Sequence, residues 1–275
     1  MKNINNPAEL ERIAGKIRLK ALEMTVAKKK GHLGGTFSCV DILVALYYGG
    51  GLGIDPSRPQ WPDRDRFILS KGHACLGLYP ILVDLGFMSQ ERFDTYGDNG
   101  GLGGQLDTGI PGVEWNTGSL GHALGVCAGM ALAAKMDRKN YRAYTLLGDA
   151  ECAEGSIWEA ITFAGEKKLN NLVALVDRNR LSVTEVLDDD SFFRSFPDAV
   201  RSLGWDCYDV DGHSIPALLE TFQKAKTSEK PVLIICQTIK GKGVSFMENT
   251  IKWHHSVPTA AELEKARAEL VKERP

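Results

Sequence analysis

The segment from residue 143 to residue 179 constrains the fold more than any other part of the chain. An apolar run at 143–147 is followed by Gly148-Asp149, then by residues with the periodicity of an amphipathic helix, and then by a second apolar run at 172–176. A strand, a loop, a helix and a second strand in this order form the βαβ unit of a parallel sheet. The segment therefore predicts an α/β protein.

Asp149 and Asn179 each follow one of these predicted strands directly. Since ligands bind at the carboxyl ends of parallel strands, both side chains are expected at the binding edge of the sheet. A carboxylate and an amide oxygen suit Mg²⁺, which usually shares its coordination shell with substrate phosphates. A helix that starts after Asp149 would also direct free N–H groups toward an anion at this edge. The alternative is that Asp149 only caps that helix and that Asn179 only forms a turn.

The composition fits one globular domain. The chain has 275 residues, of which 43% are hydrophobic and 25% are charged, enough for one large α/β domain or two small ones. No internal repeat, low-complexity segment or linker divides the sequence, so we expect a single domain over residues 1–275. The formal net charge of −2 gives no basis for binding to nucleic acid or to a membrane surface.

The sequence also predicts a cytoplasmic protein. No apolar run approaches the roughly 18–20 residues of a membrane span, and the polar N-terminus lacks the apolar core of a signal peptide. The six cysteines are scattered without a C-x-x-C pair. This pattern predicts buried, reduced thiols and argues against a zinc site.

Further helices and strands are expected on both sides of the βαβ segment. Asn6 and Pro7 predict a helix start, as N-cap and first residue, and Thr259 with Glu262 predicts a capping box for the last helix. The segment at 96–111 has no periodicity and is predicted to be a functional or mobile loop. The other expected helices lie at about 38–48, 75–85, 124–135, 190–203 and 215–226, and the other expected strands lie within 65–74 and at 232–237.

Histidines are concentrated in loops. His32 lies in G-H-L-G-G, His73 in S-K-G-H-A, His122 in S-L-G-H-A, and His254 and His255 in K-W-H-H-S. Imidazole transfers protons near neutral pH, and sugar chemistry needs several such donors and acceptors. Several histidines at separate element ends, together with a candidate phosphate and metal site, therefore indicate catalysis. The alternative is that a single loop histidine is only a surface residue.

Six sequence motifs occur along the chain in the same order as in a known protein family. They lie between about residues 15 and 258 and resemble the N-terminal part of transketolase. The resemblance implies a three-layer thiamine-diphosphate-binding fold, with a mostly parallel central sheet flanked by helices. The motifs are G-H-L-G-G, D-R-F-I-L-S-K-G-H-A, P-G-V-E-W-N-T-G-S-L-G, G-D-A-E-x-x-E-G-S-I-W-E-A, D-R-N-R-L and T-I-K-G-K-G-V-S-F-M-E.

The resemblance implies roles for three histidines. His32 and His254 would face the sugar substrate, and His73 would contact the diphosphate of the cofactor. These three are the expected catalytic residues, and His73 and His254 are also expected to contribute to cofactor binding.

The resemblance also implies a metal and cofactor site. Asp149, Asn179 and the backbone carbonyl of Leu181 would hold Mg²⁺, with Ca²⁺ or Mn²⁺ as substitutes. Lys240 would neutralise the diphosphate, and Glu154 would lie at the subunit contact in an acidic network that links paired sites. The remaining expected cofactor-binding residues are Gly118, Ser119, Leu120 and Ala150.

Three positions depart from the family pattern. Ala150 replaces the second glycine of G-D-G, keeping its N–H but losing freedom at positive φ. Gln105 stands where the family has a histidine, which leaves the usual contact to the donor carbonyl and the identity of the donor sugar open. His122 replaces a glutamine, and we expect it to be packed or on the surface.

The resemblance further implies that a second chain is needed. In transketolase, the Glu that activates thiamine and the aromatic pocket around the pyrimidine belong to the second domain, and this chain ends at Pro275. The cofactor carries the electron-sink chemistry while protein groups position and protonate, so a diphosphate-end domain alone holds half a site. We expect the N-terminal, diphosphate-binding subunit of a split transketolase, paired with a separate chain that carries the pyrimidine-binding and C-terminal domains. The expected assembly is two-plus-two, and the expected substrates are sugar phosphates.

Three other functions are alternatives to a split transketolase: a different thiamine enzyme, a non-catalytic module and a nicotinamide-binding domain. A deoxyxylulose-phosphate synthase-like fragment or a 2-oxoacid dehydrogenase α subunit would share the cofactor, but S-K-G-H-A and T-G-S-L-G favour transketolase. A non-catalytic module of the same fold would not need His32, His73 and His254. A nicotinamide-binding domain is disfavoured, because no G-x-G pair is followed by a third glycine three residues on.

Overall fold

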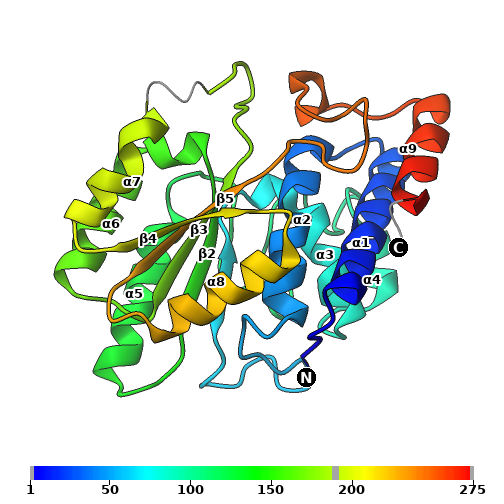
Figure 1. Ribbon diagram of the computed structural model, residues 1–275. Coiled ribbons are helices and arrows are strands. Elements are labelled where there is room, and N and C mark those ends of the chain that lie inside the picture. The colour runs from blue at the N-terminus through cyan, green and yellow to red at the C-terminus, as the bar shows by residue number, and fades with distance from the viewer. Residues whose placement is uncertain (1–2, 188–191, 273–275) are drawn as a thin grey trace.

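Five parallel strands form the centre of the protein within residues 3–187 and 192–272, the residues that the computed structural model describes. The hydrogen-bonded order is β1-β2-β3-β5-β4, and every neighbouring pair is parallel. Figure 1 shows the strands between two groups of helices. This confirms the predicted α/β fold with a parallel central sheet. The strands are β1 (Arg66–Leu69), β2 (Ala143–Gly148), β3 (Leu172–Arg178), β4 (Asp206–Asp211) and β5 (Val232–Gln237).

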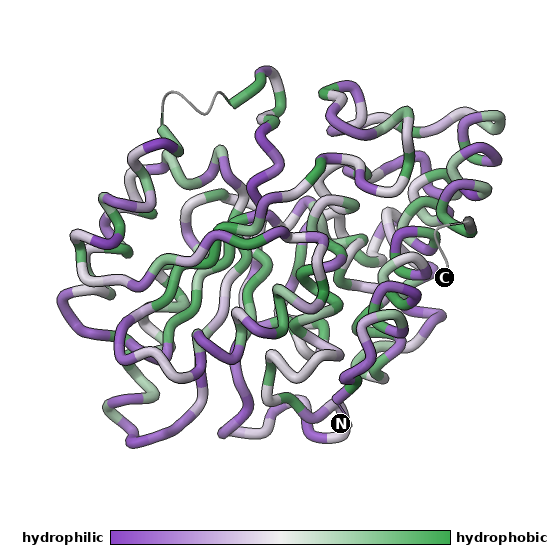
Figure 2. Tube along the Cα trace, viewed as in Figure 1, coloured by the Kyte–Doolittle hydropathy of each residue, from purple (hydrophilic) through white to green (hydrophobic). Residues whose placement is uncertain are grey.

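Both faces of the sheet are buried, which explains why its central strands are apolar throughout. In β2, Tyr144 and Leu146 belong to one hydrophobic cluster, whereas Ala143 and Leu147 belong to the cluster on the opposite face. Successive side chains of a strand point to opposite faces, and a parallel sheet covered on both faces needs apolar residues at nearly every position. Figure 2 shows the central strands largely in green for this reason.

Each cluster is completed by its own helices. The helix α2 lies deepest, and all its residues are buried. The last helix, α9, packs against α1. One cluster includes α1 (Pro7–Lys28), α2 (Leu33–Tyr48), α3 (Cys75–Asp84), α8 (Ile215–Thr227) and α9 (Ala260–Lys272), and the other includes α5 (Ala123–Met136), α6 (Gly155–Glu166) and α7 (Phe192–Ser202). Shorter elements are α4 (Gln90–Asp94) and the 3₁₀ turns η1 (Gly72–Ala74), η2 (Ala150–Ala153) and η3 (Ile251–His254).

The predicted helix caps are confirmed. The Asn6 side chain accepts a hydrogen bond of 3.1 Å from the backbone N–H of Ala8, and Pro7 is the first residue of α1. Before α9, the N–H of Thr259 donates to the Glu262 carboxylate at 2.8 Å, and the N–H of Glu262 donates to the Thr259 hydroxyl at 3.3 Å. Local side-chain hydrogen bonds therefore cap the N-termini of the first and the last helix.

Some elements differ from the sequence prediction. The strand β4 was not predicted, because its sequence D-C-Y-D-V-D is acidic and only Val210 of it is buried, as an edge position allows. The helix α2 begins at Leu33 instead of near 38. Gly34 and Gly35 weaken a helix in isolation, but tertiary burial holds them in one here. The predicted helix at 190–203 begins outside the described residues, and α7 is described from Phe192.

The structure also bears on the expected state of the cysteines and on the expected absence of a membrane span. All six cysteines are free thiols, and five of them are buried while Cys207 is half-buried. In the part of the chain that the structure describes, no helix combines the length and the apolar character that crossing a membrane requires.

Candidate active site

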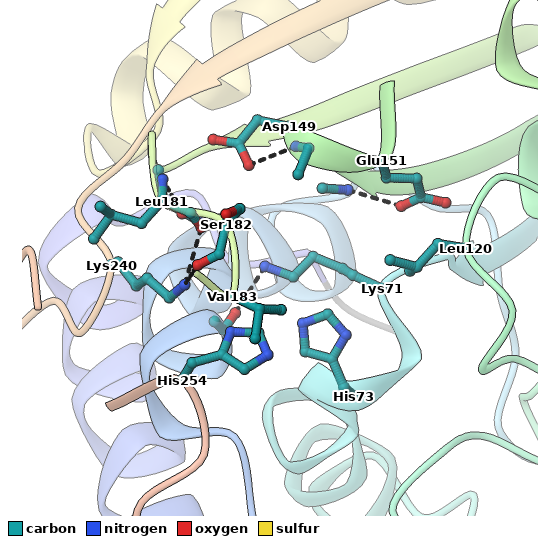
Figure 3. A pocket seen from close by; sticks show the side chains of 14 residues that line it. Lys71, His73, Leu120, Asp149, Glu151, Leu181, Ser182, Val183, Lys240 and His254 are labelled. Carbon is teal, nitrogen blue, oxygen red and sulfur yellow. Dashed lines mark hydrogen bonds between the residues drawn. The ribbon is translucent and has the colours of Figure 1, made fainter. Parts of the chain in front are cut away.

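A cavity of about 160 Å³ lies at the carboxyl ends of β1, β2, β3 and β5. The segment after each of these strands places a polar side chain in its wall, namely Lys71, Asp149, Asn179 and Lys240. Figure 3 shows the imidazoles of His73 and His254 across the cavity from Asp149. The predicted site residues that line the cavity are His73, Leu120, Asp149, Ala150, Asn179, Leu181, Lys240 and His254.

Asp149 is buried at the end of β2, with 3% of its surface exposed. Its carboxylate accepts hydrogen bonds from the backbone N–H of Ala150 at 2.8 Å and of Arg180 at 2.6 Å. Burial and then the nearby charge of Asp177 raise the pKa of Asp149, while the two backbone donors lower it. The Arg178 guanidinium lies 3.6 Å from the same carboxylate, and the nearby carboxylates of Asp149 and Asp177 favour positive charge at this edge.

The start of the helix after Asp149 was predicted wrongly. The 3₁₀ turn η2 comes first, and α6 begins only at Gly155. Glu151 explains the turn, because its carboxylate folds back and accepts from the N–H of Gly148 at 2.9 Å and of Gly121 at 2.8 Å. Burial raises the pKa of Glu151, although these donors act in the opposite direction.

An ion pair between Lys71 and Asp177 is buried beside the cavity. The Lys71 ammonium donates to the Asp177 carboxylate and, at 2.9 Å, to the carbonyl of Gly35. Asp177 also accepts from the hydroxyls of Ser38, at 2.6 Å, and Thr238. Burial opposes both charges, but their mutual attraction raises the pKa of Lys71 and lowers that of Asp177. The pair therefore stays ionised.

The pair orients Asn179. The Nδ2 atom of Asn179 donates to Asp177 at 3.1 Å, and its Oδ1 atom accepts from the N–H of Leu181 at 3.2 Å. The carboxylate of Asp149, the amide oxygen of Asn179 and the Leu181 carbonyl are therefore hard oxygen donors at the ends of adjacent strands. This donor set fits Mg²⁺. Within the described ranges, no group of three or more His, Cys, Asp or Glu side chains is placed to hold a metal, so a cation here depends on amide and carbonyl oxygens.

Lys240 closes the same edge from the end of β5. Its side chain is almost fully buried, with 1% of the residue exposed, and its ammonium donates to the carbonyl oxygens of Leu181 and Ser182, each at 2.9 Å. Burial and then the positive charge of Lys71 lower the pKa of Lys240 to about 8. Two ammonium groups in a buried wall favour an anion in the cavity.

The three predicted catalytic histidines lie close together, but only His73 and His254 line the cavity, and His32 lies beside them outside its wall. The ring centroid of His32 lies 5.3 Å from that of His73 and 5.5 Å from that of His254, and the last two are 5.4 Å apart. The ring of His255 lies 4.7 Å from His32. No partner among the described residues reaches the buried Nδ1 atoms of His32 and His254. These two nitrogens therefore have unused hydrogen-bonding capacity.

Burial keeps these imidazoles neutral. It lowers the pKa of His32 to about 4, with the His255 charge adding to the effect. Burial and then the charge of Lys240 lower the pKa of His254 to about 4. Burial and then the charge of Lys71 lower the pKa of His73 to about 2. At neutral pH all three rings can accept a proton or a hydrogen bond.

Other predicted residues lie outside the cavity wall. Gly118, whose φ of 135° favours glycine, Ser119 and Glu154 are exposed, and so is His122, which immediately precedes α5. Gln105 lines a separate pocket, and its buried Oε1 atom has no hydrogen-bond partner within the described residues.

Ala150 causes no backbone strain. It lies in the 3₁₀ turn η2 and is not among the described residues with positive φ. Alanine has the same N–H as glycine and no steric penalty in this conformation. The departure from G-D-G is therefore compatible with the local geometry.

Sequence reasoning did not single out Lys71, Glu151 and Asp177. Each lies at or just after the end of a predicted buried strand, which is the signal that identifies Asp149. Asp177 lies two residues before Asn179, and Lys71 two residues before His73. A charged residue at the end of an apolar run would have identified all three.

Comparisons with known proteins identify the family of this domain. Residues 10–273 match the family model described as transketolase, thiamine diphosphate binding domain. The chain is 44% identical over 263 residues to a subunit of apulose-4-phosphate transketolase from Phocaeicola vulgatus, covering 95% of this chain and 93% of that protein. It is 37% identical to a subunit of 6-deoxy-6-sulfo-D-fructose transketolase from Clostridium sp., covering 96% of this chain and 97% of that protein.

The fold comparison agrees with the sequence comparison. The crystal structure of transketolase from Campylobacter jejuni superposes with a TM-score of 0.92 at 28% identity. The match covers 98% of this chain but only 43% of that transketolase. The chain therefore belongs to the transketolase family and corresponds to its thiamine diphosphate binding domain.

Proposed function

We propose that this chain is the diphosphate-binding subunit of a two-chain transketolase, which transfers a two-carbon ketol unit reversibly from a ketose to an aldose. One observation carries the proposal. The cavity at the sheet edge combines oxygen ligands for a cation, two ammonium groups for an anion and neutral imidazoles for proton transfer. A magnesium-bound diphosphate with a sugar above it needs this combination.

The cofactor residues follow from the chemistry of each group. Asp149, Asn179 and the Leu181 carbonyl would hold Mg²⁺, with Ca²⁺ or Mn²⁺ as substitutes. Lys240 would neutralise the diphosphate, and His73 would donate a hydrogen bond to it. The exposed residues Gly118 and Ser119, with Leu120 and Ala150, would line the remaining path of the cofactor. When bound, thiamine diphosphate supplies a nucleophilic carbon and an electron sink for cleaving the ketose carbon–carbon bond.

His32 and His254 would exchange protons with the substrate hydroxyls. Both rings are neutral at pH 7, and each has a buried Nδ1 atom without a partner in the described part of the chain. A neutral imidazole within hydrogen-bonding reach of a hydroxyl serves as a general base and then as a general acid. The deep pKa shifts are of the kind found at catalytic positions.

A second polypeptide would close the cavity. Leu120 and Val183 line it and are 38% and 58% exposed, so apolar surface lies at its mouth. Glu154 is exposed, where a contact between subunits would cover it. We expect the partner chain to supply the pyrimidine-binding and C-terminal domains, in a cytoplasmic two-plus-two assembly.

The donor would be a ketose with an anionic end. The relatives from Phocaeicola and Clostridium are named for apulose 4-phosphate and for 6-deoxy-6-sulfo-D-fructose, which end in a phosphate and a sulfonate. Gln105, in place of the expected histidine, favours a donor different from that of the general pentose phosphate enzyme. The aldose acceptor would be a sugar phosphate.

A product screen tests the function. The chain with its partner chain, thiamine diphosphate and Mg²⁺ should convert ketose phosphates and aldoses into exchanged sugars, and should give no product from pyruvate as donor. The chain alone should give no ketol transfer. Transfer by the chain without a partner would contradict the division of the site, and turnover of pyruvate would favour a different thiamine enzyme. Failure of the complex to bind thiamine diphosphate with Mg²⁺ would favour a non-catalytic module.

A further inference from the structure

A relay of hydrogen bonds outside the cavity, from Arg18 through Asp41 and His213 to Ile239, reaches the segment that carries Lys240. It begins at Arg18 in α1, whose guanidinium donates to the Asp41 carboxylate in α2 at 3.0 and 2.6 Å. Asp41 contacts the Nδ1 atom of His213 at 2.6 Å. The Nε2 atom of His213 then accepts from the backbone N–H of Ile239 at 2.8 Å. Hydrogen bonds thus link Arg18, Asp41 and His213, which are distant in sequence, to the Thr238–Ile239 peptide group, one residue before Lys240.

The geometry fixes the tautomer of His213. The N–H of Ile239 can only donate, so the Nε2 atom of His213 must be the unprotonated acceptor. The Nδ1 atom therefore carries the proton and donates it to Asp41. Asp41 is held in the acceptor form, because Arg18 and the His213 hydrogen bond keep its pKa at about 2 against the effect of burial, the largest single contribution. In this hydrogen-bond chain the His213 imidazole is therefore neutral and the Asp41 carboxylate is ionised.

The segment around Lys240 is held at each residue by a different element. The Thr238 hydroxyl donates to Asp177, the Ile239 N–H donates to His213, and the Gly241 N–H donates to the carbonyl of Gly34 at 3.0 Å. The Ile239 N–H belongs to the Thr238–Ile239 peptide group, so its hydrogen bond, together with those of Thr238 and Gly241, restrains the backbone on both sides of Lys240.

We propose that His213, backed by Asp41 and Arg18, is a positioning residue that places Lys240 at the diphosphate end of the cavity. This inference rests on the proposed function, because it assigns His213 an effect on cofactor binding. His213 lies in the turn between β4 and α8 and does not line the cavity, so it acts through the Ile239 peptide.

Two substitutions separate the two hydrogen bonds of His213. His213→Asn keeps a donor near Asp41 but cannot reach Ile239, whereas His213→Gln can present a carbonyl oxygen to the Ile239 N–H. Ser214→Ala is the matched control, because Ser214 caps α8 in the same turn, whereas the Ile239 N–H bonds to His213. With the complete two-chain complex, calorimetry would measure thiamine diphosphate affinity at fixed Mg²⁺.

His213→Asn should weaken thiamine diphosphate binding by about tenfold, the effect of one lost hydrogen bond, with the donor KM unchanged at saturating cofactor. His213→Gln should restore most of the affinity, and Ser214→Ala should leave it unchanged. In a Lys240→Met background, His213→Asn should have no further effect. An equal loss in Ser214→Ala, or a full loss in the Lys240→Met background, would overturn the proposal.

Hydrogen exchange tests the same inference without the cofactor. The Ile239 amide should exchange faster in the full-length His213→Asn chain than in wild type, Ser214→Ala or His213→Gln. Unchanged exchange in His213→Asn would overturn the positioning role, even if the wild-type complex binds its cofactor. By contrast, a wild-type complex that does not bind thiamine diphosphate would count against the proposed function, whatever the exchange data show.

Discussion

The Lys240 ammonium and the Leu181 carbonyl oxygen lie 2.9 Å apart in a hydrogen bond. The same carbonyl is the expected third ligand of the metal ion. An ammonium and a divalent cation on one oxygen would repel each other, so we expect Lys240 to turn from Leu181 toward the diphosphate when the cofactor is loaded. The contact makes Lys240 the most informative residue for mutation.

Replacing Lys240 with methionine should weaken thiamine diphosphate binding by about ten- to a hundredfold, because a charge-assisted hydrogen bond to an anion is lost. Calorimetry at fixed Mg²⁺ measures the change. Lys242→Met removes the same charge two residues away, from a partly exposed side chain, and should leave the affinity within about twofold of wild type. Equal affinities of Lys240→Met and wild type would remove Lys240 from the site.

Binding of the cofactor should weaken as the pH rises through about 8. The pKa of Lys240 is lowered to about 8 by burial and by Lys71, and a bound diphosphate favours its protonated form, so binding takes up a proton. Affinity should fall by up to about tenfold per pH unit above this value. Titrations between pH 7 and 9 in buffers of different ionisation enthalpy would measure the proton uptake. The slope should disappear in Lys240→Met, and a persistent slope would assign the proton to another group.

Asp149→Asn and Asp177→Asn should differ in their effect on folding. Burial and the charge of Asp177 raise the pKa of Asp149 above its unfolded value, so stability is gained as the pH falls through the folded pKa. The buried Arg178 guanidinium lies 3.6 Å from Asp149, so Asp149→Asn should lower the free energy of unfolding, but by less than Asp177→Asn does, while it abolishes Mg²⁺-dependent cofactor binding. Asp177→Asn should cost about 3–5 kcal/mol, because it leaves Lys71 buried and unpaired.

Urea unfolding at pH 7 compares these two isosteric variants directly. Both replace a buried carboxylate at the end of a strand, so the fold and the burial are matched. A similar loss of stability in both variants would show that Asp149 is a structural residue and would contradict its assignment as a metal ligand.

The histidine cluster should make the fold sensitive to acid. Burial lowers the pKa of His32 and His254 to about 4 and that of His73 to about 2, compared with about 6.5 in an unfolded chain. The unfolded chain binds more protons in this interval, so stability is lost as the pH falls from about 6.5 toward 4. His73→Asn should lose less stability than wild type between pH 7 and 5 in urea titrations. His122→Asn, on an exposed side chain outside the cluster, is the control for replacing a histidine.

The strands that could be predicted are buried strands, because burial gives them a continuous apolar sequence. The residues of β5, Val232 to Gln237, were predicted with their correct bounds, because an apolar run between turns leaves few alternatives. The strand β4 was not predicted, because an edge strand buries few side chains and its acidic sequence D-C-Y-D-V-D resembles a loop. Sequence patterns therefore identify the centre of the sheet better than its edge.

The strand ends alone predict Asp149 and Asn179 as candidate site residues, whereas Lys240 was expected only from the resemblance to transketolase. The pairing of Lys71 with Asp177 could not be predicted, because 106 residues separate them and only the strand order brings them together. The Lys240 contact to Leu181 depends on the same order. Local sequence gives the chemical groups, whereas the register of parallel strands decides which of them meet.

The origin of the cavity wall has a consequence for assembly of the fold. Four strands each contribute one polar group, and the first and last of these groups, Lys71 and Lys240, are far apart in the sequence. A sheet that lacks one of these strands would therefore bind the ligand only weakly. Since the ligand binds only the complete sheet, a saturating concentration of it would stabilise all four strands together against unfolding.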